Sequence, residues 1–185
     1  MPYVRTSGPT AAPPSRHGTL RDRLLAELKS ESSTFGQPLI VETFFDPGIE
    51  LRIFWDEWLP LSDADRSTVA IAAYSEQFGD ERAGLIGLLE TSTYPEAELE
   101  GSLPYEVVPL LRKSDPVTRE QCEDWMREFG ASEAFDRPRL LFPTEKMAEE
   151  CYKALRQHHP EAAEVWAVTQ RPVISLGGFA AADFR

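Results

Sequence analysis

The only residues in the sequence that resemble a transition-metal site are Cys151, His158 and His159. Thiolate and imidazole groups are good ligands for transition metals. However, Cys151 falls on the apolar side of an expected helix, and adjacent histidines point in different directions. The two histidines also follow the C-terminal end of that helix, where a partial positive charge is favourable. We therefore expect structural roles for all three, with a metal-binding protein as an open alternative.

Pairs of acidic residues are a second source of possible chemistry, because two carboxylates can perform acid–base catalysis or hold Mg²⁺. Asp56 and Glu57 stand out, since they lie between Trp55 and Trp58 and desolvation beside aromatic rings can raise a carboxyl pKa. An enzyme that uses Asp56 and Glu57 therefore stays open. Other pairs are so abundant that nothing selects one of them: Asp63 with Asp65, Asp80-Glu81 and Glu149-Glu150.

Established catalytic signatures are missing from the sequence. It contains no G-x-S-x-G elbow, no P-loop, no G-x-G-x-x-G and no C-x-x-C. Cys122 lies one turn from Met126 and is expected in the core, and neither thiol has the basic neighbourhood that would activate it. These absences favour a non-catalytic protein, and they predict no cofactor.

Composition places the chain among globular proteins. It has 185 residues, 42% of them apolar, and 19 basic against 31 acidic side chains give a net charge of −12. No stretch approaches the roughly 18 consecutive apolar residues of a membrane helix, and the start does not resemble a signal peptide. Two cysteines are too few for a disulfide framework. We therefore expect a cytoplasmic protein with no membrane association.

The negative charge is concentrated in the middle of the chain. Residues 30–110 carry three arginines against sixteen acidic residues, whereas residues 1–23 carry four arginines against one aspartate. An acidic body disfavours nucleic acid, except through the N-terminal arm. The same acidity favours a protein partner with a basic surface.

Residues 19–104 predict a first half built as helix, hairpin and helix. Before it, residues 1–18 are rich in Pro, Gly and Ser and predict a disordered arm. A helix capped by Thr19 is expected to end near Ser30, and strands are expected over Leu39–Phe45 and 50–58. A helix capped by Ser62 is expected over 63–78. A second helical stretch follows over 81–90 and a polar loop over 91–104. A turn is expected at Asp46-Pro47-Gly48, where Pro47 fixes φ and Gly48 permits a positive φ.

Residues 105–175 predict a second half in the order β-α-β-α-β, followed by a loose tail over 176–185. Pro109 predicts an edge or short strand over Tyr105–Leu111. The expected later elements are a helix from the capping box of Thr118 and Gln121 to Phe129, a strand over Arg139–Phe142, a helix from Thr144 to about Gln157 and a strand over Val165–Thr169. The whole pattern is that of an α+β fold, and it leaves open whether the halves share one sheet.

Residues 20–78 resemble the BolA family, whose domains have an αββαβ order related to KH-type nucleic-acid domains. The segment from Arg21 to Leu28 looks like the first helix of that family, and Trp58 stands eight residues before Arg66, as an aromatic residue does before the family's arginine. Ser67 and Thr68 follow Arg66 where the family has histidine and arginine, and the family's iron–sulfur histidine has no counterpart. The resemblance therefore implies a scaffold and, as an alternative function, a nucleic-acid-associated regulator.

The preferred hypothesis is a small acidic adaptor or regulatory protein that acts by binding another protein. It is based on the missing catalytic motifs, the acidic middle and the aromatic residues of the expected hairpin. The candidate binding residues lie at the end of this hairpin and the start of the next helix: Phe54, Asp56, Glu57, Trp58, Asp63 and Asp65.

Overall fold

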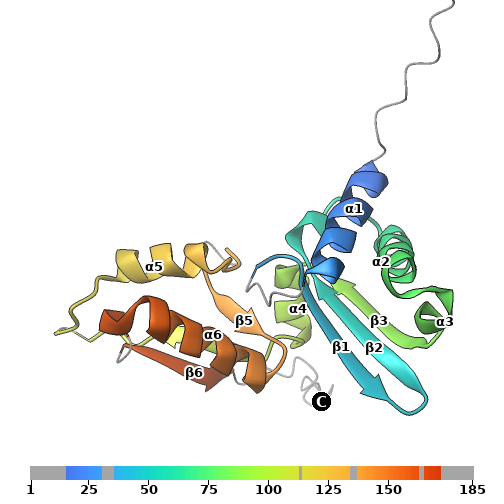
Figure 1. Cartoon of the computed structure of the whole chain (residues 1–185). Coiled ribbons are helices and arrows are strands. Elements are labelled where there is room, and N and C mark those ends of the chain that lie inside the picture. Colours follow the sequence, from blue (N-terminus) through green and yellow to red (C-terminus); the bar gives the residue numbers. More distant parts are fainter. Residues whose placement is uncertain (1–15, 31–35, 113, 134–136, 163–164, 172–185) are drawn as a thin grey trace, which may run out of the picture.

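The computed structural model describes residues 16–30, 36–112, 114–133, 137–162 and 165–171. The first half contains α1 (Arg16–Lys29), β1 (Leu39–Phe45), β2 (Gly48–Phe54), the 3₁₀ helix η1 (Asp56–Trp58), α2 (Asp63–Phe78), α3 (Asp80–Ala83), β3 (Ile86–Ser92) and α4 (Tyr94–Glu100). The second half contains β4 (Tyr105–Pro109), α5 (Arg119–Glu128), β5 (Leu140–Phe142), α6 (Glu145–His158), the 3₁₀ helix η3 (Pro160–Ala162) and β6 (Trp166–Gln170). This is the predicted α+β fold, and each half has its own three-stranded sheet (Figure 1).

The first sheet has the strand order β1-β2-β3. The predicted hairpin is confirmed, because β1 and β2 pair antiparallel, while β3 pairs parallel with β2. Since side chains alternate between the faces of a strand, Leu51 and Ile53 of β2 point to one side, where they pack on α1 and α2. Apolar residues of both helices complete this core: Leu20, Leu24, Leu25, Val69, Ala70, Ala73 and Tyr74.

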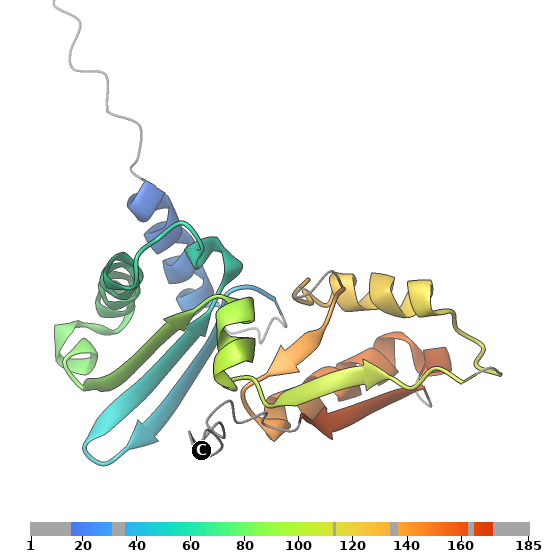
Figure 2. The same ribbon diagram turned by 180° about the vertical axis from the view of Figure 1, so that it is seen from behind.

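The opposite face of the same sheet carries α4 and reaches the second half. Phe54, Leu39 and Val41 pack there against Tyr94 and Ala97 of α4, together with Leu103. Leu141 of β5 belongs to this cluster and is 2% exposed, so it joins the two halves through a small shared core. Figure 2 shows α4 between the first sheet and the second half.

The second sheet has the order β5-β4-β6. Of the two alternatives predicted from Pro109, the edge strand is therefore wrong, and the short strand is confirmed, since β4 has five residues. β4 is the central strand and pairs antiparallel with both neighbours. Pro109 is its last residue, where a missing N–H removes only one donor at the end of the ladder. Helices α5 and α6 supply the core, in which Cys122, Cys151 and Leu155 are fully or almost fully buried.

The predictions for residues 81–104 are wrong. Only Asp80–Ala83 forms a short helix, and the apolar run after it is the strand β3, because β2 offers it a parallel pairing partner. The expected loop contains α4, which begins with a capping box between Thr93 and Glu96 and has Pro95 in its first turn.

Smaller corrections concern element ends. Helix α1 begins at Arg16, three residues before the expected cap Thr19, and β2 ends at Phe54. Gly48 is not among the described glycines with positive φ; a Cβ there would lie 2.9 Å from the Leu85 carbonyl oxygen, so close approach favours glycine. The predicted caps Ser62, Thr118 and Thr144 are confirmed.

Two predicted segments lie largely outside the described residues. The arm over 1–18 is described only from residue 16, and the tail over 176–185 is not described. Within the described part of the chain, no helix is both long and apolar enough to cross a membrane.

Candidate functional site

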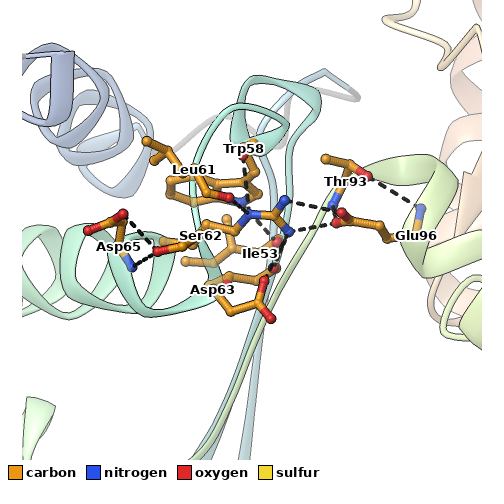
Figure 3. Close-up of polar contacts among 10 residues, drawn as sticks. Ile53, Trp58, Leu61, Ser62, Asp63, Asp65, Thr93 and Glu96 are labelled. Atoms are coloured by element: carbon orange, nitrogen blue, oxygen red, sulfur yellow. Dashed lines mark hydrogen bonds and ion pairs between the residues drawn. The ribbon is translucent and has the colours of Figure 1, made fainter.

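Arg66 is a buried charge in the first turn of α2, only 5% exposed. Its Nε–H donates to the carbonyl oxygens of Trp58 and Leu61, each at 3.2 Å, and Nη1 donates to the Thr91 carbonyl at 3.3 Å. These carbonyls come from the η1 turn and from the end of β3, so one guanidinium connects both to α2 (Figure 3). Ser62 starts α2 by accepting from the N–H of Asp65, which fixes where Arg66 projects.

Glu96 is the charged partner of Arg66. Its two carboxylate oxygens accept from Nη1 and Nη2 of Arg66 at 2.6 and 3.1 Å. One of these oxygens also accepts from the backbone N–H of Thr93 at 2.8 Å, which closes the capping box of α4 (Figure 3). The hydrogen bonds from Arg66, with those from Thr93, lower the pKa of Glu96 to about 2. The pair therefore ties α4 to α2 in its ionised form.

Three more carboxylates gather around this pair, and together with Glu96 we call them the acidic cluster: Asp63, Glu90, Glu96 and Glu100. Asp63 lies 3.8 Å from Arg66, and its side chain is 97% exposed. Burial raises the pKa of Glu100, and the negative charges of Glu90, Glu96 and Asp63 raise it further. Among the described residues, Arg66 is the one cation named as lowering the pKa of Glu100, so the described side chains of this corner carry an excess of negative charge.

Two of the predicted binding residues are core residues. Phe54 and Trp58 are both 0% exposed. Trp58 packs edge to face on Trp55 with ring centroids 5.0 Å apart, and its indole N–H donates to the Ile53 carbonyl at 3.3 Å. Both rings are buried inside the folded chain and present no apolar surface to a partner. The prediction that Phe54 and Trp58 contact a partner is therefore corrected.

The predicted acids have separate structural partners. The Asp56 carboxylate accepts from the Gln37 amide at 2.8 Å and from the backbone N–H of Tyr94 at 3.0 Å, while Glu57 forms an ion pair with Arg23. Since Asp56 and Glu57 are bonded to different groups, the geometry gives no support to a shared proton. Asp65 accepts from the hydroxyl of Ser62 at 2.7 Å. Of the six candidates, only Asp63 belongs to the acidic cluster.

The candidate metal residues have structural surroundings. Cys151 is 0% exposed, and burial raises the pKa of its thiol to about 12. His159 stacks on Trp125 with centroids 4.4 Å apart, and His158 lies edge to face with Phe129 at 5.7 Å. Among the described residues, no group of three or more His, Cys, Asp or Glu side chains could hold a metal ion.

Sequence reasoning did not identify three members of the acidic cluster. The sequence pattern predicts a helix for the segment that contains Glu90. It predicts a polar loop for the segment that contains Glu96 and Glu100. The available signal was Thr93-Tyr94-Pro95-Glu96, which fits a capping box and would have indicated α4. No family model matches the chain, and neither a search of curated proteins nor a search of solved structures returns a match.

Proposed function

We propose that the protein is a non-catalytic protein-binding module and that its acidic cluster docks a basic surface of the partner. The observation that carries this proposal is the convergence of these carboxylates where α2, β3 and α4 meet around Arg66, with Asp63 almost fully exposed. Burial raises the pKa of Glu100 most, and the charges of Glu90, Glu96 and Asp63 raise it further. Carboxylates that repel one another in the free protein gain from a cation brought by a partner. The charge is thus unfavourable for the isolated fold and useful for recognition.

The residues of the acidic cluster are also fixed by the fold. This favours binding because they lose little conformational entropy when a partner docks. Glu96 is fixed by Arg66 and by the cap of α4, and Glu90 belongs to β3 in the first sheet. Asp63 is in the first turn of α2 and remains almost fully exposed. A partner therefore meets carboxylates positioned by two helices and a strand, and we expect its basic residues to set association rate and salt dependence.

The test compares two variants with the same change in charge. The cluster variant combines Asp63→Asn, Glu90→Gln and Glu100→Gln and spares the structural Glu96. The control combines Glu81→Gln, Glu120→Gln and Glu145→Gln, which are exposed acids outside the cluster. We expect a fluorescent ten-residue lysine peptide to bind the cluster variant about tenfold more weakly than the control at low salt.

The same two variants identify partners in cells. Chemical cross-linking followed by mass spectrometry should show proteins that are recovered with the wild type and the control variant but lost with the cluster variant. Equal recovery with both variants, or equal binding of the lysine peptide, would refute the proposal. So would native mass spectrometry of the extracted protein that shows a free monomer under every condition.

A second candidate is a nucleic-acid-associated regulator on a BolA- or KH-like scaffold. The element order favours it: α1, the β1–β2 hairpin, α2 and then β3 follow the αββαβ order that the resemblance implies. Titration with single-stranded DNA and RNA oligonucleotides at low salt tests this candidate. We expect binding to be lost when residues 1–18, which contain Arg5 and Arg16, are deleted, and unchanged binding or no binding at all would contradict it.

A further inference from the structure

A cleft in the second half has a cationic rim, although the protein as a whole is acidic. It has a volume of about 330 Å³ and lies between the end of β4, the start of α5 and the segment before β5. This volume is at the lower end of the range for small-molecule sites, roughly 300–1,000 Å³. The cleft includes no residue of the acidic cluster, so binding of a ligand here does not depend on the proposed docking of a partner.

Apolar side chains form part of the cleft wall. Val108 and Pro109 come from β4, Met126 from α5, and Leu111 from the chain that follows β4. Met126 is 3% exposed, whereas Leu111 is 37% exposed and stands open to a ligand. Such a wall favours a compact apolar group over a polar one.

Among the residues that the structure describes, the charged side chains lining the cleft do not balance. They comprise three arginines (Arg119, Arg137 and Arg139) and two glutamates (Glu106 and Glu123). The Arg139 guanidinium donates hydrogen bonds to both carboxylate oxygens of Glu106, at 3.1 and 3.3 Å. The Arg119 guanidinium donates to the Glu123 carboxylate at 2.8 Å. These contacts use both described carboxylates of the cleft, so one of its described arginines has no described carboxylate as a partner.

That cation is Arg137, which is exposed. Within the described ranges, no carboxylate lies within 4.0 Å of its guanidinium, in contrast to Arg119 and Arg139. A guanidinium offers parallel N–H donors that match the two oxygens of a carboxylate. A guanidinium that no described carboxylate contacts, placed beside an apolar wall, is therefore suited to a ligand with one carboxylate and an apolar body.

We propose that this cleft binds a monoanionic carboxylate with a compact apolar body, held by Arg137 and seated against Leu111 and Val108. Two sources share this chemistry: a small organic acid and the C-terminal residue of a peptide. The volume admits an apolar body of the size of a leucine side chain or a short branched acid. Both sources present a carboxylate attached to an apolar body, and the experiment below distinguishes the small acid from the peptide.

The test uses the full chain labelled with ¹⁵N and four probes: 4-methylpentanoate, its neutral amide, the peptide acetyl-Gly-Gly-Leu and the same peptide with a C-terminal amide. We expect saturable shifts at the amides of Val108, Leu111 and Met126 with one or both acids, and at least tenfold weaker binding of the matching amides. A response to the small acid alone identifies the first source, and a response to the peptide acid alone identifies the second. Equal binding of acid and amide, or no saturable shift up to about 10 mM, would overturn the proposal.

Variants of the rim complete the test. Arg137→Gln should weaken binding of the acid about tenfold, whereas the matched control Lys146→Gln, exposed on α6, should leave it unchanged. Glu123→Gln removes the partner of Arg119 and should tighten binding several-fold. Unchanged affinity in Arg137→Gln would show that Arg137 does not hold the carboxylate and would overturn the assignment, whatever the effect of Glu123→Gln.

Discussion

Arg66 and Glu96 lie thirty residues apart in the chain and form a two-point ion pair, with N–O distances of 2.6 and 3.1 Å. Arg66 is buried in the first half, and Glu96 caps the helix that leads into the second half. Because Arg66 also donates to three backbone carbonyls, the pair is the centre of a polar network and not an isolated surface salt bridge.

Removing either member of this pair should destabilise the protein unequally. We expect Arg66→Met to lower the free energy of unfolding by about 3 kcal/mol, because three carbonyls and Glu96 lose a donor. Glu96→Gln should cost about 1–2 kcal/mol, since its side chain is 39% exposed and water screens the charge. Urea unfolding of both single variants and the double variant gives the coupling, and additive effects would contradict a direct pair.

The contribution of Glu96 should depend on pH. Its pKa is lowered from the ordinary 4.5 to about 2, so the unfolded chain takes up a proton at higher pH than the folded protein. The stabilisation is therefore complete above about pH 4.5 and is lost as the pH falls toward 2. Unfolding of wild type and Glu96→Gln from pH 6 to 2.5 should show a shrinking difference, and a constant difference would refute the linkage.

Leu141 should couple the two halves, because it is the only side chain of the second sheet in the cluster around Phe54 and Tyr94 among the described residues. Leu141→Ala should cost about 2–4 kcal/mol. Variants that keep tryptophans only at positions 55 and 58, or only at 125 and 166, report on each half separately. We expect Leu141→Ala to separate two transitions that coincide in the wild type, whereas Leu140→Ala, in the core of the second half, should shift that half alone.

The two thiols should be inert in the folded protein. Burial raises the pKa of Cys151 to about 12, and burial also raises the pKa of Cys122, so little thiolate is present at pH 8. Ellman's reagent should react with both cysteines in 8 M urea but at least a hundredfold more slowly in buffer. Rapid reaction of native Cys151 would show that the second core opens or that the thiol is activated.

Local sequence determined the starts of α2, α5 and α6, the hairpin and the class of the fold. Ser62, Thr118 and Thr144 cap helices through hydrogen bonds that span three residues, and the hairpin turn joins strands that are neighbours in the chain. Such features depend on short-range contacts, so the order of nearby residues is sufficient to predict them. The burial of Leu51 and Ile53 likewise follows from simple alternation.

Only the tertiary structure decided the secondary structure of residues 81–104 and the burial of Phe54 and Trp58. The segment after Ala83 is a strand because β2, more than thirty residues earlier, offers its edge in parallel, and periodicity could not distinguish a short apolar strand from a helix. Trp58 is buried because α1 and α2 close over it. The acidic cluster forms where α2, β3 and α4 converge around Arg66, and residues so far apart in sequence become one site only when packing brings them together.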